Sequence, residues 1–239
     1  MKVVLSIGGS VLAPDLDHGR VRAYADAVET LVDAGCSLGV VVGGGGVARE
    51  YIRAARALGA NEIQLDQLGI AVTRLNARLL IAALGDRAAV APAVDYDDAV
   101  ETMRRGEVAV MGGAIPGQTT DAVSAAIAEQ VEADLLVFAT SVDGVYSADP
   151  NANDDVERYP ELTAGELVEV ISGIEMAAGS SAPVDLLGAK LIERSGMRTI
   201  VLDGSDPAAV VGAVLEGEHS GTDVLPGPDA PVPPLWPQG

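Results

Sequence analysis

Short, nearly uninterrupted apolar runs alternate with longer helical patterns along this chain, and no other feature constrains the fold as strongly. Strands of a parallel sheet that helices cover on both faces have no solvent side, so they are apolar throughout. Strands that alternate with helices predict such a sheet between two helical layers. We therefore expect an α/β fold, a three-layer αβα sandwich with a largely parallel central sheet. The predicted strands are 3–7, 38–42, 88–91, 108–111, 135–139 and 199–202.

Helical patterns fill the stretches between these runs. The segment 67–84 carries apolar residues on much of its circumference, which fits either core burial or a subunit interface. Thr163 and Glu166 have the spacing of a capping box, which predicts that a helix begins there. The predicted helices are 19–34, 46–58, 67–84, 96–105, 120–131, 163–172, 184–195 and 206–215.

Residues 226–239 differ in composition from the rest of the chain. They hold six of its 13 prolines, and proline removes a backbone donor and fixes φ. We therefore expect one domain over 1–225 and a proline-rich, extended or disordered tail over 226–239. Trp236, the single tryptophan, could dock on a neighbouring element, but the composition favours a solvated tail.

The charge balance is strongly acidic. The chain has 35 Asp and Glu residues against 15 Lys and Arg, a formal net charge of −20. Such a field repels nucleic acid and anionic membranes, which need clustered cations. Either the surface is simply very soluble or the protein works in a salt-rich cytosol, where at 1 M the Debye length is only about 3 Å. The near absence of lysine, which is left only at Lys2 and Lys190, favours adaptation to salt.

The remaining composition indicates a cytoplasmic protein. Cys36 is the only cysteine, so the chain forms no internal disulfide and suits a reducing compartment. The chain opens into a strand rather than into a basic and apolar leader. No apolar run approaches the roughly 20 residues of a membrane span.

Four glycine-containing turns each follow a predicted strand, at 8–10, 43–46, 112–121 and 140–150. Glycine lets backbone approach a ligand closely, and ligands of open α/β sheets bind outside the carboxyl ends of the strands. After the second turn a helix N-terminus and the planar fork of Arg49 suit a phosphate. One such turn alone is explained by a tight strand-to-helix connection, but four together predict two anionic ligands side by side.

Two familiar phosphate motifs fit poorly. A Walker A loop needs Gly-Lys-Ser/Thr, and neither lysine lies in that setting, so a P-loop kinase is excluded. Gly43, Gly45 and Ala48 match a loose dinucleotide fingerprint, with Glu62 and Asp66 about 20 residues on. That acid should end a second strand, and 61–65 is too short and polar to form one.

At these residues the chain resembles the amino acid kinase superfamily, most closely the archaeal-type uridylate (UMP) kinases. The resemblance runs from Lys2 to about Leu225 and leaves out the proline-rich tail. Its motifs are Ile7-Gly-Gly-Ser-Val-Leu12, Val41-Val-Gly-Gly-Gly45 with Ala48-Arg49, Leu68-Gly-Ile70 with Thr73-Arg-Leu-Asn-Ala77, Gly112-Gly-Ala-Ile-Pro-Gly-Gln-Thr-Thr-Asp-Ala122, Val142-Asp-Gly-Val-Tyr146 with Asp149-Pro150, and Ala189-Lys190 with Arg194-Ser195.

The resemblance implies transfer of a phosphoryl group from ATP to UMP with Mg²⁺, in a homohexamer. It implies ATP contacts at Gly9, Ser10, Gly45, Arg49, Thr140, Tyr146 and Asp149. It implies UMP contacts at Gly44, Asp66, Ala114, Ile115, Pro116, Gly117, Gln118, Thr119 and Thr120. Asp121 would organise the catalytic groups and Lys190 would neutralise the transferring phosphoryl. No side chain is assigned to a metal.

One departure from the family bears on the chemistry. Ser6 stands where many members of the superfamily have a lysine, so one electrostatic stabiliser is missing and Lys190 and Mg²⁺ must do more. A kinase for another small acidic substrate, such as isopentenyl phosphate or acetylglutamate, is the first alternative. A nucleotide- or oxyanion-binding oligomer without catalysis is the second. Asp66 and Thr119–Thr120 favour a nucleotide, and Lys190 with Asp121 favours catalysis.

Overall fold

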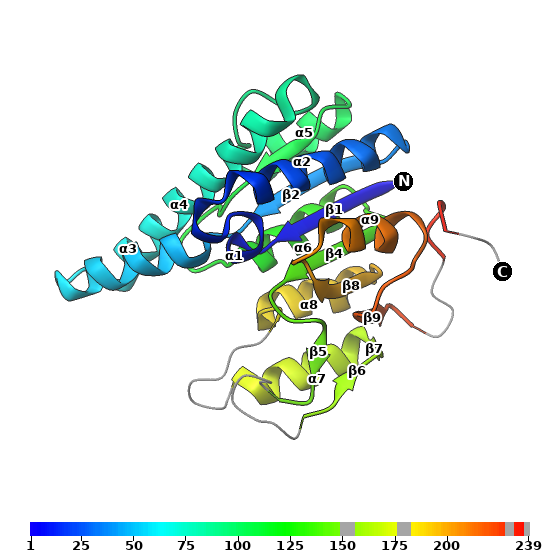
Figure 1. The fold of residues 1–239 in the computed structure, drawn as a ribbon. Helices are drawn as coiled ribbons and strands as arrows, with labels where there is room; N and C mark the ends of the chain where they lie inside the picture. The colour runs from blue at the N-terminus through cyan, green and yellow to red at the C-terminus, as the bar shows by residue number, and fades with distance from the viewer. Residues whose placement is uncertain (149–155, 176–182, 228–231, 237–239) are drawn as a thin grey trace.

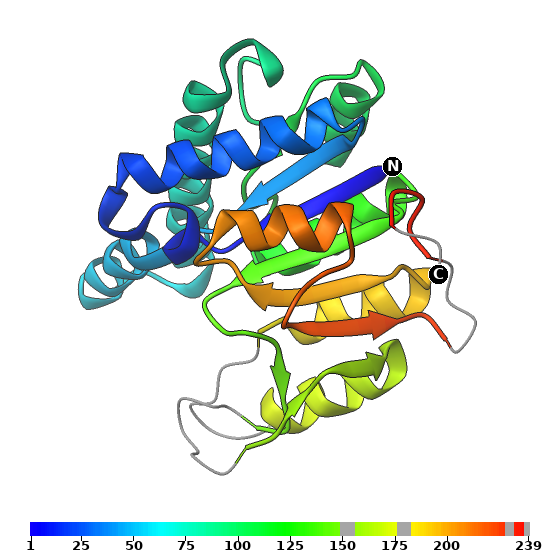
Figure 2. The ribbon, with the colours of Figure 1, turned by 45° about the vertical axis from the view of Figure 1, so that its right-hand side comes forward.

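A seven-stranded sheet forms the centre of the computed structural model, which describes residues 1–148, 156–175, 183–227 and 232–236 (Figures 1 and 2). The strand order is β3-β2-β1-β4-β8-β9-β7. The strands are β1 (Lys2–Ile7), β2 (Ser37–Val42), β3 (Ala109–Met111), β4 (Leu135–Thr140), β7 (Glu161–Thr163), β8 (Thr199–Asp203) and β9 (Thr222–Leu225). A separate two-stranded sheet pairs β5 (Val145–Tyr146) with β6 (Arg158–Tyr159).

Strands β3, β2, β1, β4 and β8 run parallel, whereas β9 pairs antiparallel with β8 and β7 parallel with β9. The carboxyl ends of the five parallel strands therefore share one edge of the sheet. The four glycine turns follow β1, β2, β3 and β4 and all leave from this edge, as the sequence predicts.

Helices cover both faces of the sheet. Alternate residues of β1 show the division, since Leu5 and Ile7 belong to one apolar cluster and Val4 to the other. The first face carries α1 (Gly9–Leu12), α2 (His18–Asp33), α4 (Glu62–Leu84) and α9 (Pro207–Leu215). The second carries α5 (Tyr96–Arg104), α6 (Thr120–Gln130), α7 (Ala164–Glu175) and α8 (Leu186–Ser195). The predicted αβα sandwich is confirmed.

Helix α3 (Gly45–Ala57) packs against α4 and extends away from the sheet (Figure 1). Short 3₁₀ turns follow α1 at Pro14–Leu16 and α4 at Gly85–Arg87. Helix α4 begins at Glu62 rather than at 67, because Asn61 and Gln64 form a capping box. This helix occupies the segment where a dinucleotide fold would need its second strand. The capping box of Thr163 and Glu166 is also present.

The predicted strand at 88–91 is wrong. Here the chain makes only isolated bridges, from Ala88 to Val108 just before the edge strand β3 and from Ala93 to Met111 within it. Pro92 lies between them and has no N–H to donate, which interrupts a ladder. Four short strands were not predicted, namely β5, β6, β7 and β9, because their two to four residues contain no long apolar run.

By length and composition alone, Glu62–Arg87 is the one helical segment of the described residues that could cross a membrane, since an 18-residue window of it has a mean hydropathy of 1.4. Its position explains its composition, because one side of α4 is part of the core through Leu65, Leu80 and Leu84. The other side leaves Leu75 and Leu79 exposed. The apolar pattern of 67–84 therefore fits core burial on one side of the helix, and the exposed side leaves a subunit interface as a prediction.

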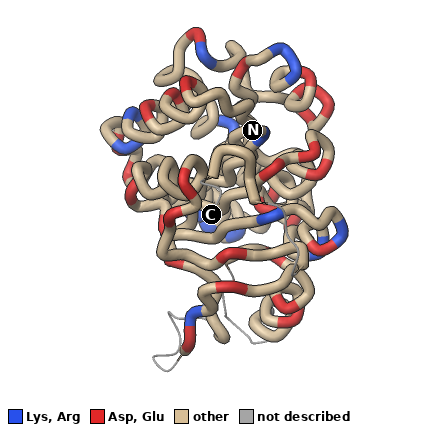
Figure 3. Tube along the Cα trace, turned by 90° about the vertical axis from the view of Figure 1, so that its right-hand side faces the viewer, with Lys and Arg blue, Asp and Glu red and all other residues tan. Residues whose placement is uncertain are grey.

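Most acidic residues lie along the outer parts of the chain trace (Figure 3). The buried polar residues of the described segments include no Asp or Glu; they are Ser6, Thr73, Asn76, Thr102, Ser124, Thr199 and Thr222. Most carboxylates therefore face water and salt, where repulsion between them is screened; Asp121, which desolvation affects, is the exception.

The expectation of a solvated tail is wrong at Trp236. The indole is 9% exposed, belongs to the core cluster on the α2–α9 face, and donates from Nε1 to the Val214 carbonyl at 2.9 Å. The Arg198 guanidinium lies 4.5 Å from the ring centroid, and a Cβ on Gly217 would come within 2.8 Å of the ring. Burial of a large aromatic surface outweighs the extended tendency of the prolines.

Replacing Trp236 with alanine should lower the free energy of unfolding by about 3–5 kcal/mol, because a buried aromatic side chain is lost. Denaturant unfolding in molar KCl, followed by far-UV circular dichroism, measures the change. The neighbouring Leu235, which is 39% exposed, provides the matched control, and Leu235→Ala should change stability by no more than about 0.5 kcal/mol. Equal stability of the two variants would contradict the docked position of the indole.

Candidate active site

The first two glycine loops touch each other through their backbones. A Cβ on Gly9 would lie 2.3 Å from the Gly45 nitrogen and 2.4 Å from the Gly43 oxygen. Gly45 has a φ of +63°, and its Cβ would lie 2.5 Å from the Gly9 carbonyl carbon. The Gly8 N–H donates to Ala139 O at 3.0 Å, which joins the end of β4 to the same point. No side chain fits between these loops, so glycine is required there.

A cavity of about 300 Å³ opens beside this contact. Five of the predicted ATP contacts line it, namely Gly9, Ser10, Gly45, Arg49 and Thr140. The Arg49 guanidinium donates to the Ser10 hydroxyl at 3.0 Å, so a planar cation already lies in the wall. Ser6 and Asp121 also face this cavity.

A second cavity of about 290 Å³ contains part of the predicted UMP set. Gly44, Asp66, Gln118, Thr119 and Thr120 line it. Ala48, Ile52, Gly69, Ile70, Thr73 and Gly113 complete the wall. The site therefore combines an apolar side with a few placed polar groups, as small-molecule sites do.

The two cavities share a wall formed by Gly44, Gly45, Arg49 and Thr120. Arg49 comes from α3 and Thr120 from the N-terminus of α6. Ligands in the two cavities would meet at this wall. A guanidinium and a helix N-terminus both favour anions there, so the shared wall suits the meeting of two phosphate groups.

Two buried polar residues of α4 hold the glycine loops, and the sequence analysis assigned them no role. The Asn76 amide donates to Gly43 O at 2.9 Å and to Gly44 O at 3.3 Å. The Thr73 hydroxyl accepts from the Gly113 N–H at 2.7 Å. The signal that could have found them is a Thr-x-x-Asn pair on the side of the helix whose other buried residues, such as Val72, Ala77 and Leu80, are apolar.

Tyr96 fixes the orientation of Gln118 in the second cavity. Its hydroxyl donates to Gln118 Oε1 at 2.6 Å, and burial raises the pKa of the phenol, which keeps it a neutral donor. Gln118 therefore keeps its NH₂ for another acceptor, and the described part of the chain shows no acceptor bonded to it. A ligand oxygen could take this position.

The predicted UMP contacts from Ala114 to Gly117 are not on the wall of this cavity. Gly117 donates its N–H to Asp66 Oδ2 at 2.9 Å, so it positions one predicted contact instead of lining the site. Ala114, Ile115 and Pro116 are likewise absent from the wall, and Ile115 is exposed. The structure thus brings five of the nine predicted UMP contacts together.

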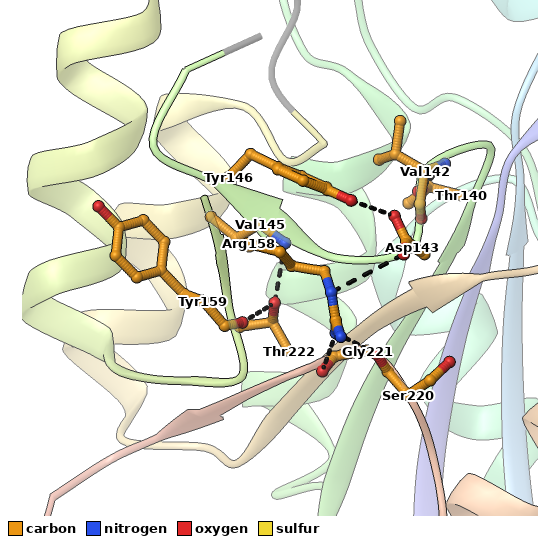
Figure 4. A network of polar contacts seen from close by, with 10 residues as sticks. All are labelled: Thr140, Val142, Asp143, Val145, Tyr146, Arg158, Tyr159, Ser220, Gly221 and Thr222. Carbon is orange, nitrogen blue, oxygen red and sulfur yellow. Dashed lines mark hydrogen bonds and ion pairs between the residues drawn. The ribbon is translucent and has the colours of Figure 1, made fainter. Parts of the chain in front are cut away.

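The fourth loop reaches the first cavity only through its beginning. Thr140 and Ser141 line the cavity, whereas Tyr146 lies off the wall and donates its hydroxyl to Asp143 at 2.7 Å (Figure 4). The predicted contact Asp149 falls outside the described residues.

Asp121 lies in the first turn of α6, where Thr119 caps the helix by accepting from the Ala122 N–H at 3.2 Å. Desolvation, together with the charge of Asp185, raises the pKa of Asp121 to about 7. The Asp185 backbone N–H and the Ser6 hydroxyl, 3.5 Å away, oppose this shift. Asp121 therefore changes charge near neutral pH.

Lys190 does not reach this group. Its ammonium donates to Glu193 Oε2 at 3.0 Å on the exposed side of α8, and it lines neither cavity. The beginning of α8 is closer to the site, because Asp185 caps the helix and accepts a hydrogen bond from the Thr119 hydroxyl.

The sequence model of the amino acid kinase family matches residues 1–203 of this chain. The chain belongs to the amino acid kinase family. Among curated relatives of this amino acid kinase, the uridylate kinase of Halobacterium salinarum (strain R1) is 69% identical over 226 residues, 95% of this chain and 94% of the relative. That of Halorubrum lacusprofundi is 64% identical over 233 residues, 97% of each chain.

Solved structures agree with the fold of this amino acid kinase. The crystal structure of uridylate kinase from Archaeoglobus fulgidus has a TM-score of 0.84 and is 46% identical, covering 94% of this chain and all of the other. The UMP kinase structure from Bacillus anthracis, at 24% identity and a TM-score of 0.77, shows the shared fold alone.

The kinase offers oxygen donors rather than a closed metal cage. Within the described residues no group of three or more His, Cys, Asp or Glu side chains lies together. Ser6, Ser10 and Asp121 bring oxygens to the first cavity. This set fits Mg²⁺, which keeps several waters and is held by one or two carboxylates together with substrate phosphates.

Replacing Asp121 with asparagine should change how stability depends on pH. The folded pKa lies above the unfolded value, so the carboxyl favours the folded state below about pH 4 and loses this effect as the pH rises to about 7. The unfolding free energy of the variant relative to the parent should therefore rise by up to about 1.4 kcal/mol per pH unit in this window. Denaturant titrations at fixed molar KCl measure it, and a difference that is flat with pH would contradict the shifted pKa.

Proposed function

We propose that this chain is a UMP kinase, which transfers the γ-phosphoryl group of ATP to UMP and releases UDP and ADP. The observation that carries the proposal is the pair of adjoining cavities with Arg49 in their shared wall. Relatives named uridylate kinase, 62–69% identical over 226 residues or more, support the choice of substrate.

The proposed arrangement places ATP in the first cavity and UMP in the second. The UMP phosphate lies at Thr120 and Arg49, where it faces the γ-phosphoryl group across the shared wall. Asp66 is an acceptor and suits the ribose hydroxyls of UMP. Phosphoryl transfer needs this in-line placement and charge stabilisation, and little covalent chemistry from the protein.

Mg²⁺ is the proposed cofactor, and Asp121 with Ser10 would hold it together with the ATP phosphates. When bound it neutralises charge on the transferring group. The protein's own contributions are the fork of Arg49, the N-terminus of α6 and the closely packed glycine backbones, which hold the two nucleotides in position.

Lys190 joins the site in this proposal when nucleotide occupies the first cavity. Its present partner is weak, because both Lys190 and Glu193 are largely exposed and exposed ion pairs contribute little. The Thr119–Asp185 hydrogen bond couples the start of α8 to the loop that faces UMP. A phosphate beside Asp121 offers the ammonium a stronger partner than Glu193.

The exposed apolar side of α4 is the proposed contact between subunits of a homohexamer. Leu79 forms a shallow apolar cavity with Leu16 and Val21, and Leu75 continues the same side of the helix. The proposed location of the enzyme is the cytoplasm.

Release of ADP from ATP and Mg²⁺ tests the function with UMP, CMP, AMP or isopentenyl phosphate as acceptor, each in low and in molar KCl. We expect turnover with UMP that is highest in molar KCl, because screening removes distant repulsion between the chain and its ligands. Turnover with isopentenyl phosphate instead would change the substrate. No turnover by folded protein would favour the non-catalytic alternative.

Replacing Lys190 with alanine should lower kcat by about 100-fold or more, the scale expected for one preorganised stabiliser of the transition state. Lys2→Ala is the matched control, since it removes the other lysine, whose ammonium donates to Val131 O at 2.7 Å away from both cavities. Near-parental turnover of Lys190→Ala would remove Lys190 from the catalytic groups.

A further inference from the structure

Arg158 links three separate segments of the chain (Figure 4). It comes from β6, and its guanidinium donates to Gly221 O at 2.9 Å and to Ser220 O, both just before β9. Its Nε lies 3.8 Å from Asp143 Oδ2 in the fourth loop. One side chain therefore connects β6, the start of β9 and the loop that follows β4.

Asp143 is held from two sides. Arg158 faces its Oδ2, and the Tyr146 hydroxyl donates to its Oδ1 at 2.7 Å. Tyr146 is one of the ATP contacts that the family resemblance implies. The ion pair with Arg158 therefore fixes the carboxylate to which the Tyr146 hydroxyl donates. Without Arg158, the Asp143 carboxylate would stand unbalanced by any cation that the described residues place on it.

A second contact holds the same loop. The Thr222 hydroxyl accepts from the Val145 N–H at 2.8 Å and donates to Tyr159 O at 2.5 Å. Gly144 has a φ of +148°, and a Cβ there would lie 2.6 Å from Thr222 Oγ1 and 3.0 Å from Arg158 Cδ. The loop thus packs directly on Arg158 and Thr222, with no room for a side chain between them.

The held loop begins at the cavity. Thr140 and Ser141 line the wall, and the Thr140 hydroxyl closes a local turn by donating to Val142 O at 2.9 Å and accepting from Val142 N at 3.1 Å. Asp143 is only three positions after Thr140 in the chain, so a shift of Asp143 would move the part of the cavity wall that Thr140 and Ser141 form. The second cavity contains none of these groups.

We propose that Arg158 is a positioning residue for the nucleotide in the first cavity: it fixes the 140–146 loop and neutralises Asp143, and so sets the affinity for ATP without touching the transferred group. This inference rests on the proposed assignment of ATP to the first cavity. It predicts a defect confined to ATP, because Arg158 contacts neither the shared wall nor the second cavity.

Replacing Arg158 with alanine should raise the KM for ATP by about tenfold, the equivalent of one charge-assisted contact, with kcat and the KM for UMP within about twofold of the parent. Arg158→Lys should recover part of the affinity by restoring the charge beside Asp143. Asp143→Asn in the Arg158→Ala background should also recover part of it by removing the unbalanced carboxylate. Arg87→Ala, which breaks an exposed ion pair with Asp33, is the control for loss of one cation.

Calorimetric titration of each variant with ATP and Mg²⁺, without any acceptor, separates this inference from the choice of UMP. Weaker binding in Arg158→Ala with partial recovery in the other variants supports the role even if UMP is not phosphorylated. Unchanged ATP binding would overturn it. So would a parallel loss of kcat and of UMP affinity, or a failure of both restoring variants, because each indicates a general structural role.

Discussion

The backbone contact between the first two glycine loops is the constraint on which the site depends. Strands β1 and β2 pair in parallel and end side by side, so the turns that follow them must pass within contact distance. Gly9 meets Gly43 and Gly45 with no space for a methyl group. This contact places the N-termini of α1 and α3 next to each other, and Arg49 one turn into α3. Two cavities with a shared wall follow from it, because ligands can approach from either side of the touching loops.

A chain with a net charge of −20 can bind two anions because few of its acidic groups line the two cavities, whose described walls contain only Asp121 and Asp66. Most other Asp and Glu residues lie on the outer surface, where salt at molar concentration screens them within about 3 Å. Arg49 is the charged residue among the four that form the shared wall. A ligand anion in contact with its guanidinium is too close for bulk ions to screen the attraction between them. Local cations and helix N-termini therefore decide binding, and the distant field has little effect at high salt.

The sequence predicted what depends on local pattern. The apolar runs at 38–42 and 135–139 became strands, and the glycine turns after them formed the cavities, because parallel strands bring their ends to one edge. Asn76 and Thr73 escaped prediction, since a helical pattern gives no direction toward a distant carbonyl. The burial of Trp236 was not predicted, because the composition of a segment indicates its own conformational tendency and not the distant residues against which it packs. Lys190 was selected because lysine is rare in this chain, but the rarity of a residue does not predict where its side chain points. In the structure its ammonium donates to Glu193.

The serine at position 6 helps to explain why the charge of Asp121 depends on pH near neutrality. A lysine there would compensate the carboxylate and lower its pKa, whereas the Ser6 hydroxyl, 3.5 Å away, opposes the shift only weakly. Desolvation and the charge of Asp185 consequently prevail, and the neutral form of Asp121 is favoured up to about pH 7. Any cation that arrives beside it, whether the Lys190 ammonium or a metal carried by a nucleotide, favours the charged form and displaces the proton. With serine and no fixed cation at position 6, we expect the charge of this carboxylate to change when a cation enters the cavity, which a permanently paired aspartate would not allow.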